Sequence, residues 1–127
     1  MKFLIKILFV LLSLFQKSSP RTIAPEDLFS PREKYYVALF YLDSCLACRN
    51  SKRILEELSE RNRFPLYYID FSECRFYNAA DSNIGATAFS EIEVRAVPHA
   101  MIIYEGRVTD ERIGYEALDA LQNPYRF

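Results

Sequence analysis

The chain of 127 residues lacks a strong net charge. Its 16 lysines and arginines nearly balance its 17 aspartates and glutamates, so the formal net charge is -1. Binding to the phosphate backbone of a nucleic acid depends on a positive field, which this composition does not supply. The 9 Tyr and 10 Phe fall mostly in strand-like runs and are not interleaved with lysine and arginine, as a base-stacking surface requires. We therefore expect no nucleic-acid partner.

A long hydrophobic run is also missing. The apolar stretch 7–15 has nine residues, well short of the roughly 20 that cross a bilayer as a helix. It follows Lys2 and Lys6 and precedes a polar stretch at 16–20, which is the layout of a secretory signal. We expect residues 1–19 to be a signal peptide or, if they are not cleaved, an N-terminal membrane anchor, and we expect membrane contact only if they are retained. This predicts a protein of the secretory pathway or of an extracytoplasmic compartment, either secreted or in the endoplasmic reticulum lumen or periplasm.

Internal repeats and low-complexity segments are absent too, and the length suits one domain. Half of the residues are hydrophobic, which is enough to fill one core. Residues 20–33 contain three prolines and many charges, so we expect a lead-in segment with a short helix around residues 26–29. The domain itself is expected to span residues 34–127.

The hydrophobic pattern predicts alternating strands and helices. Residues 35–42 form a continuous apolar run, typical of a strand that is covered on both faces. The other expected elements are a helix at 46–62, a strand at 66–71, a loop and short helix within 72–92, a hairpin of strands 100–104 and 107–113 around Gly106, and a terminal helix at 115–122. A strand, helix and strand in succession imply a right-handed parallel unit, and the closing hairpin makes the sheet mixed. The fold class is therefore α/β, with helices expected on both faces of the sheet.

The helix at 46–62 is expected to be amphipathic. Its apolar positions recur at helical spacing, and its charged residues, Lys52 and Glu56 among them, can form opposite-charge neighbours three or four positions apart. We expect these charges to form a solvated face.

Only three cysteines are present: Cys45, Cys48 and Cys74. In an oxidising compartment one of these thiols has no internal partner. Cys45 follows the first strand and begins the helix, where unpaired backbone N–H groups and the helix dipole favour a thiolate. Cys48 lies one turn later, close enough to form a disulfide with Cys45 or to attack a mixed disulfide formed there. Cys74 is either a semi-buried spare thiol or a third working thiol that pairs with a partner or regulates the pair.

Two other interpretations of the cysteine pair are a zinc site and two inert buried thiols. Zinc needs two further ligands, and only Cys74 and His99 are available. Both would have to converge on a helix start that already holds a close pair. Neither interpretation explains the order of the strands, the proline at position 98 or the hairpin, and we expect no metal.

Several further motifs accompany the pair. The set comprises the strand Tyr35 to Leu42, the motif Cys45-Leu-Ala-Cys48, the strand end Tyr68-Ile-Asp70, the dipeptide Val97-Pro98, the hairpin Tyr104-Glu-Gly-Arg-Val108 and the dipeptide Ile113-Gly114. Together these features, spread over residues 34–122, resemble the thioredoxin superfamily. The resemblance implies a thioredoxin-like fold with a mixed central sheet of about four strands flanked by helices. It also implies a cis peptide bond before Pro98, which would lie against the cysteine pair, and a Val97 backbone available to an extended substrate segment.

The chain departs from thioredoxins around the pair. Ser44 stands where thioredoxins that act as reductants have tryptophan, and Leu46-Ala47 replaces Gly-Pro between the cysteines. The residues between the cysteines tune the thiolate, so the resemblance leaves open whether the protein oxidises, reduces or isomerises. Leu39 falls at the position of a buried acid that accepts the proton of the second cysteine. His99, next to the proline, either donates to the thiolate or packs its ring at the rim of the site.

The resemblance and the pair together predict a thiol-disulfide oxidoreductase that acts on protein cysteines. Cys45 would be the nucleophile and Cys48 the resolving cysteine, with Val97, Pro98 and His99 on the substrate side. The pair itself carries two electrons, so no bound cofactor is expected. The expected partners are cysteine-containing protein substrates and a redox protein that recycles the pair. The alternative is a binding module of the same fold that captures client proteins in a larger complex and turns over little.

Overall fold

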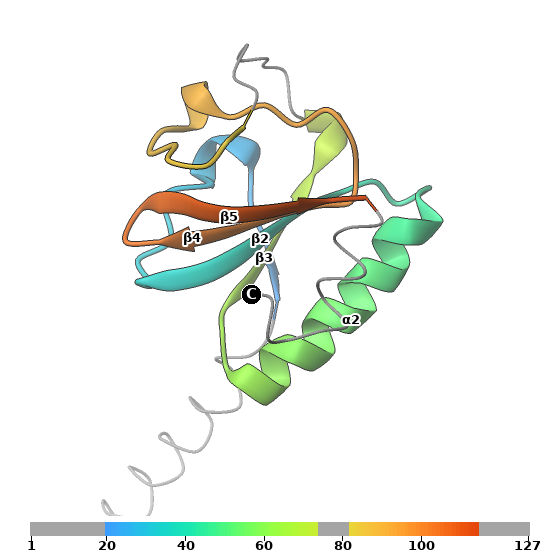
Figure 1. Cartoon of the computed structure of the whole chain (residues 1–127). Coiled ribbons are helices and arrows are strands. Elements are labelled where there is room, and N and C mark those ends of the chain that lie inside the picture. Colours follow the sequence, from blue (N-terminus) through green and yellow to red (C-terminus); the bar gives the residue numbers. More distant parts are fainter. Residues whose placement is uncertain (1–19, 74–81, 115–127) are drawn as a thin grey trace, which may run out of the picture.

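The computed structural model describes residues 20–73 and 82–114 of the chain (Figure 1). The elements in chain order are β1 (Arg21–Thr22), the 3-10 helix η1 (Pro25–Asp27), β2 (Tyr35–Tyr41), α2 (Leu46–Asn62), β3 (Leu66–Asp70), the 3-10 helices η2 (Phe71–Glu73) and η3 (Phe89–Glu91), β4 (His99–Tyr104) and β5 (Arg107–Ile113). The expected signal segment, Cys74 and the expected terminal helix lie outside the described residues. Within the part described, no helix has the length and apolar character needed to span a membrane.

Five strands form one mixed sheet, in the order β1-β3-β2-β4-β5. β2, α2 and β3 make the expected parallel unit, with Val37 of β2 opposite Leu66 of β3 and Tyr41 opposite Asp70. β4 runs antiparallel to β2, and β5 runs antiparallel to β4. The α/β class and the mixed sheet are therefore confirmed, and Figure 1 shows α2 lying along one side of this sheet.

The sheet has one strand more than the four or so expected. The additional strand, β1, pairs in parallel with β3 through Arg21 and Thr22. Just after η1, Leu28 is fully buried in the core. Residues 20–33, expected as a lead-in, thus add a strand to the sheet and a side chain to the core. Two residues are too few to show the alternating pattern by which a strand is recognised in a sequence.

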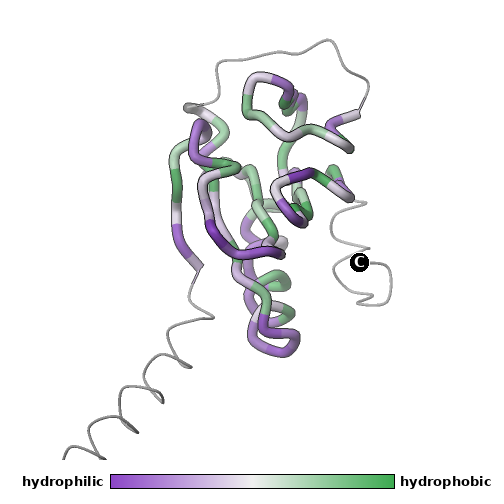
Figure 2. Tube along the Cα trace, turned by 90° about the vertical axis from the view of Figure 1, so that its left-hand side faces the viewer, coloured by the Kyte–Doolittle hydropathy of each residue, from purple (hydrophilic) through white to green (hydrophobic). Residues whose placement is uncertain are grey.

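Helix α2 has the bounds that its periodicity predicted. Its buried residues recur every three or four positions and so form one face: Cys48, Ser51, Leu55, Leu58 and Ser59. The helix is closed by Arg63, whose φ of 54° is the left-handed conformation common after the last helical turn. The Ser59 hydroxyl donates to the carbonyl of Phe64 at 2.5 Å, which ties the helix to the chain entering β3. The polar end of α2 is the purple tip at the bottom of the tube in Figure 2.

Alternate side chains of β2 point to opposite faces of the sheet, and both sets are buried. One set packs against α2: Val37, Leu39 and Tyr41. The other set packs on the far face: Tyr36, Ala38 and Phe40. The continuous apolar run of this strand is explained by burial on both sides, as predicted.

The far face of the sheet is covered differently from the α2 face. Among the described residues, 3-10 turns and irregular chain cover it, with Leu28, Ile92 and Val94 buried against it. Of the helix expected within residues 72–92, the described part contains only 3-10 turns, the end of η2 and the single turn η3. Ile92 and Val94 alternate with polar Glu93 and Arg95, which is the period of extended chain and not of a helix. The expected helical covering of both faces is therefore found on one face in this part of the chain.

The β4–β5 hairpin turns at the predicted position. Glu105 and Gly106 both have positive φ, 51° and 73°, as a tight two-residue hairpin turn requires. The turn pairs Tyr104 with Arg107, and a register shift between Ile102 and Ile103 then moves the pairing by one residue, so that His99 lies opposite Ile113.

Candidate active site

The two cysteines of the motif lie where β2 leads into α2. Cys45 is the N-cap residue of α2, with φ -91° and ψ 113°, and its Sγ accepts a hydrogen bond from the backbone N–H of Cys48 at 3.1 Å. The N–H of Cys45 donates to the carbonyl of Leu42 at 3.1 Å and so closes the connecting turn. The sulfur takes the place of the side-chain oxygen that usually caps a helix, at the positive end of the helix dipole.

The two sulfurs differ in exposure. Cys45 is half-buried, whereas Cys48 is 1% exposed, and both are free thiols. Burial and the side-chain hydrogen bond with Cys45 raise the pKa of the Cys48 thiol to about 11, although the backbone of Leu42 and the charge of Lys52 act in the opposite direction. The pair therefore has one accessible sulfur and one protected sulfur that stays protonated at neutral pH.

The peptide bond between Val97 and Pro98 is cis, as the resemblance implied. Pro98 is buried, and its carbonyl accepts a hydrogen bond from the N–H of Gly114 at 2.8 Å. Val97 is half-buried and packs against the cluster that contains Cys48. Because β4 runs antiparallel to β2, its first residue lies beside the end of β2, at the edge where α2 begins. The structure thus brings Val97, Pro98 and the cysteine pair to one edge of the sheet.

His99 is buried on the other side of the sheet. Its side chain is 1% exposed and lies 6.1 Å, between ring centroids, from Phe40, which faces away from α2. Met101, two positions on in the same strand, packs on that far face as well. The sequence placed the His99 ring either at the thiolate or at the rim of the site, and it occupies neither position. Successive side chains of a strand point to opposite faces, which turns this ring away from the helix that carries the cysteines.

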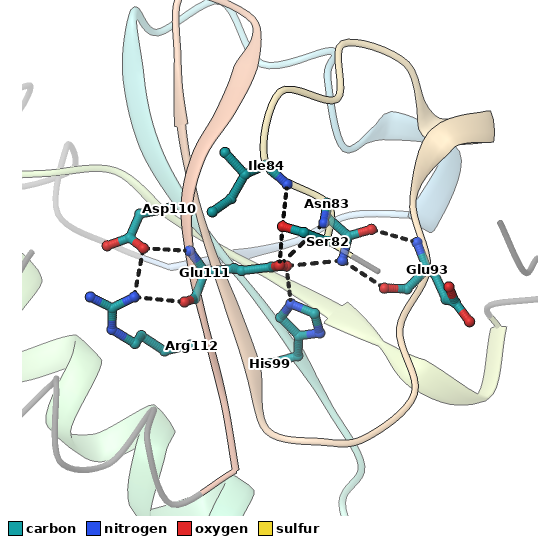
Figure 3. A network of polar contacts seen from close by, with 8 residues as sticks. All are labelled: Ser82, Asn83, Ile84, Glu93, His99, Asp110, Glu111 and Arg112. Carbon is teal, nitrogen blue, oxygen red and sulfur yellow. Dashed lines mark hydrogen bonds and ion pairs between the residues drawn. The ribbon is translucent and has the colours of Figure 1, made fainter. Parts of the chain in front are cut away.

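The His99 ring joins a polar network centred on Glu111 (Figure 3). The Glu111 carboxylate accepts hydrogen bonds from Ser82 Oγ at 3.1 Å, from the Asn83 N–H at 3.1 Å and from Asn83 Nδ2 at 2.9 Å, and it lies 2.9 Å from His99 Nε2. Asn83 also bonds the backbone of Glu93 through both side-chain atoms, at 2.7 Å each. Burial alone would raise the pKa of Glu111, but the hydrogen bonds from His99 and Asn83 outweigh burial and lower it to about 2. An ionised carboxylate only accepts, so Nε2 of His99 is the donor.

Sequence reasoning did not single out Asn83 or Glu111. Their contacts join residues 28 positions apart, and neither residue belongs to a recognisable motif. A charged residue in the last strand of a hairpin reads as part of a solvated face. No sequence signal distinguishes Glu111 from the other charged residues of β5.

Three side chains near the pair bear on its chemistry. Leu39, at the position where the resemblance placed an acid, is fully buried in the same cluster as Cys48. Leu46, between the cysteines, is 70% exposed. Arg49 donates from Nε to the carbonyl of Asp43 at 3.1 Å, so its guanidinium is tied to the turn that precedes the pair.

A metal interpretation of the pair gains no support from its neighbours. Within residues 20–73 and 82–114, no group of three or more metal-ligating side chains is arranged to hold an ion. The sheet separates His99 from Cys45 and Cys48, which removes one of the two extra ligands that zinc would need.

No protein-family model matches this sequence, and a search of curated proteins finds no match. Solved structures do match. A mutant thioredoxin from Halobacterium salinarum is 24% identical, with a TM-score of 0.60, over 85% of this chain and 88% of its own. Oxidised thioredoxin O2 from Arabidopsis thaliana is 18% identical, with a TM-score of 0.60, over 87% and 95% of the two chains. A chain from a structure on the thiol resolving mechanism of yeast mitochondrial 1-Cys peroxiredoxin is 16% identical, with a TM-score of 0.61, over 87% and 98%.

The protein has the thioredoxin fold. The matches cover most of both chains, which agrees with the strand order and the cis peptide bond found here. At these identities the likeness establishes the thioredoxin fold, and the chemistry has to be argued from the geometry of the site itself.

Proposed function

We propose that the protein is a thiol-disulfide oxidoreductase that acts on the cysteines and disulfides of other proteins. The observation that carries this proposal is the arrangement of the pair. Cys45 Sγ is half-buried at the start of α2 and accepts the N–H of Cys48, whose own thiol is buried behind it. An accessible sulfur at a helix N-terminus suits a nucleophile, and a neighbour one turn away suits a resolving thiol.

The exchange has two steps, and each conserves atoms and electrons. The Cys45 thiolate attacks one sulfur of a substrate disulfide, which forms a mixed disulfide and releases the other substrate sulfur as a thiolate. Cys48 then loses its proton and attacks Cys45 Sγ, which closes the intramolecular disulfide and expels the second substrate sulfur. The substrate gains two electrons and the pair loses two, so a separate redox protein has to return the pair to its dithiol form. The reverse sequence oxidises a substrate dithiol.

We place the substrate segment along Val97, beside the pair. Val97 is half-buried next to the Cys48 cluster, and Pro98 has no N–H that would compete for the sulfurs. Leu46, next to Cys45 in the chain, is exposed and offers a further apolar contact. A similarly folded chain comes from work on thiol resolution in a peroxiredoxin, which supports a protein thiol as the natural partner. The buried side chain of His99 takes no part in this proposed contact.

Turnover of a disulfide substrate tests the proposal. Reduction of insulin by the full chain, with dithiothreitol as the recycling reductant, should exceed the rate without protein, and Cys45→Ser should remove that excess. Activity that Cys45→Ser leaves unchanged, or no activity over a range of glutathione poises, would refute the enzyme proposal. Cys74→Ser serves as the control for the third thiol.

A trapping experiment identifies the nucleophile. In Cys48→Ser the second step is blocked, so mixed disulfides with substrate should accumulate on Cys45 and disappear on reduction. In Cys45→Ser they should not form at the pair. Accumulation in Cys45→Ser and not in Cys48→Ser would reverse the two roles.

One observation favours a second function, a binding module that captures clients with little turnover. Burial raises the pKa of Cys48 to about 11, so little of the resolving thiolate exists at neutral pH and a mixed disulfide would be long-lived. The lifetime of a mixed disulfide on the wild-type chain separates the two functions. Release within seconds supports the enzyme, whereas release over hours supports capture.

The compartment is part of the proposal. We infer export from the cytoplasm from the signal-like layout of residues 1–19, as a secreted or membrane-anchored protein. Cell fractionation together with N-terminal sequencing tests this inference. A protein recovered from the cytosol with an intact N-terminus would overturn it.

A further inference from the structure

Lys52 lies on α2 one turn after Cys48, and its ammonium does not extend freely into solvent. The Lys52 Nζ atom is 3.4 Å from the centroid of the Tyr41 ring and 4.9 Å from that of the Tyr68 ring. The two rings contact each other edge to face, with centroids 5.9 Å apart. A cation over aromatic faces is held by electrostatic attraction, and more strongly where water is partly excluded. The lysine head group is therefore fixed between the helix and the sheet.

The same two tyrosines belong to the buried cluster that contains Cys48. Tyr41, Tyr68 and Cys48 are 8%, 8% and 1% exposed. Residues four positions apart on a helix are neighbours, so Lys52 and Cys48 project from the same side of α2. A positive charge held at the edge of a poorly solvated cluster acts on a buried group more strongly than one in open water.

Among residues 20–73 and 82–114, the ionisable side chains that act on Cys48 or share its cluster are Cys45 and Lys52 at the start of and within α2, Tyr41 on β2 and Tyr68 on β3. Further along α2, the Glu56 carboxylate accepts a hydrogen bond from the Tyr68 hydroxyl at 2.5 Å, so this carboxylate is bound to the Tyr68 side chain. β4 adds only apolar side chains to the cluster, Ala100 and Ile102. Within this described set Lys52 is the cation, and its charge acts to lower the pKa of the Cys48 thiol.

We propose that Lys52 is the charge partner of Cys48, and that its ammonium, fixed by Tyr41 and Tyr68, stabilises the Cys48 thiolate as it forms to resolve a mixed disulfide. The inference deepens the proposed function and rests on it. Leu39 is buried in the same cluster, so β2 offers no carboxylate at this position to accept the Cys48 proton. The charge of Lys52 lowers the cost of removing that proton. The proton itself passes to the departing substrate thiolate, directly or through water, so the step yields one thiol and the intramolecular disulfide.

The expected size of the effect follows from thiolate chemistry. Removing an opposite charge near a partly buried thiol raises its pKa by about one unit, which lowers the thiolate fraction at neutral pH about tenfold. The remaining thiolate is more basic and about threefold more nucleophilic, since reactivity follows basicity with a slope of roughly 0.4 to 0.5. Resolution should therefore slow by about three- to fourfold when the charge is lost.

A titration of Cys48 tests the proposal without any need for turnover. The full chain, labelled with 13C at the cysteine β-carbons, is titrated by NMR in its reduced form, and each signal is assigned with single cysteine-to-serine variants. Lys52→Met keeps the aliphatic stem and should raise the pKa of Cys48. Lys52→Arg keeps the charge and should leave it near the wild-type value. Lys34→Met is the matched control, because Lys34 also sits over an aromatic ring, 5.4 Å from the Tyr104 centroid, but outside the Cys48 cluster.

An unchanged Cys48 pKa in Lys52→Met overturns the proposal, and so does an equal shift in Lys34→Met. Thermal unfolding of the same variants separates charge from packing, since a merely structural Lys52 would lower the melting temperature without moving the pKa. Tyr41→Leu removes the ring that holds the ammonium. It should raise the Cys48 pKa in the presence of Lys52 and should have little further effect in Lys52→Met.

A single-turnover measurement connects the titration to the reaction. Resolution of a preformed mixed disulfide on Cys45 at pH 7 should be about three- to fourfold slower in Lys52→Met than in the wild type or Lys52→Arg. A wild-type chain that forms no mixed disulfide would refute the proposed function while the titration still decides the role of Lys52. Equal resolution rates in all variants, with a shifted pKa, would show that the charge partnership does not serve the exchange and would overturn this inference.

Discussion

The two faces of the sheet treat polar side chains in opposite ways. On the far face, the Glu111 carboxylate is surrounded by donors from Ser82, Asn83 and His99, and the group is fixed as an anion. On the α2 face, Cys48 is buried as a neutral thiol, and Lys52, whose charge acts to lower the pKa of that thiol, lies over the Tyr41 ring of the same cluster. The far face thus holds the Glu111 carboxylate, an anion whose hydrogen bonds are already made, and the α2 face holds the Cys48 thiol, which becomes an anion only during the reaction.

The contrast shows how a strand separates structure from chemistry. Pro98 and His99 are neighbours in the sequence, yet Pro98 follows the loop at the cysteine edge while the side chain of His99 is buried on the far face. The far-face network ties residues 82–93 to β4 and β5, and so supports the start of β4 from behind. If the two roles are separate, a substitution on one face of the sheet should leave the other face unaffected.

The largest effect on stability should come from removing the centre of the far-face network. Glu111→Ala leaves the donors of Asn83 and His99 without their acceptor and should lower the free energy of unfolding by about 3 kcal/mol, or roughly 10 °C in melting temperature. The pKa of Cys48 should not change. Calorimetry measures the change in stability, and the cysteine titration measures the pKa of Cys48. Glu105→Ala, which removes an exposed carboxylate, is the control. A Cys48 shift in Glu111→Ala would break the separation between the faces.

Acid should weaken the same network in a defined pH range. The pKa of Glu111 is lowered from 4.5 to about 2 in the folded chain, so the folded state holds its carboxylate ionised where the unfolded state binds a proton. Its contribution to stability is therefore complete above about pH 4.5 and is lost as the pH falls towards 2. Glu111→Gln cannot titrate, so the stability difference between wild type and variant should shrink over this range in urea unfolding at fixed pH values. A constant difference from pH 6 to pH 2.5 would contradict this assignment.

A smaller loss of stability is expected from His99→Gln. This substitution tests the residue that the sequence placed at the site and the structure places on the far face. Glutamine can keep a donor near Glu111, so we expect a loss of about 1 kcal/mol in unfolding free energy. The rate of disulfide exchange per folded molecule should stay within about twofold of wild type, since the ring faces away from the pair. Insulin reduction measured beside thermal unfolding checks this. A tenfold slower exchange with unchanged stability would show that His99 contributes to substrate binding after all.

Much of the fold could be predicted because its signals are local. The period of α2 and the apolar run of β2 are each contained in a short stretch of sequence, as is the turn at Gly106. The position of Cys45 at the helix start followed from the order of these two elements. β1 could not be predicted, because two residues carry no pattern and its pairing depends on β3, more than 40 residues away.

The site could be predicted only in part, because the rest depends on which face each side chain takes. The charges of α2 predicted a solvated face, and most of them are exposed, but Lys52 is half-buried over Tyr41 and Glu56 accepts a hydrogen bond from Tyr68. Those contacts form only when β2, β3 and α2 are packed together, and the spacing of residues within α2 does not predict them. The face taken by His99 likewise depends on where β4 begins after the cis bond.

The smallest effect should come from Lys34, a lysine that resembles Lys52 in its aromatic contact but not in its surroundings. Lys34 Nζ lies 3.2 Å from Glu105 Oε1, with side chains 66% and 60% exposed, and 5.4 Å from the Tyr104 ring centroid. Exposed ion pairs contribute little because water screens them, so Lys34→Met should change the unfolding free energy by no more than about 0.5 kcal/mol. Chemical denaturation of Lys34→Met and Lys52→Met in parallel measures the contrast. If the two variants differ in the Cys48 pKa but hardly in the free energy of unfolding, the burial of Cys48 explains why the Lys52 charge affects a thiol while the Lys34 charge does not. If Lys34→Met instead costs more than 1 kcal/mol, the aromatic contact itself is strong at both sites, and the fixed position of Lys52 needs no contribution from the buried cluster.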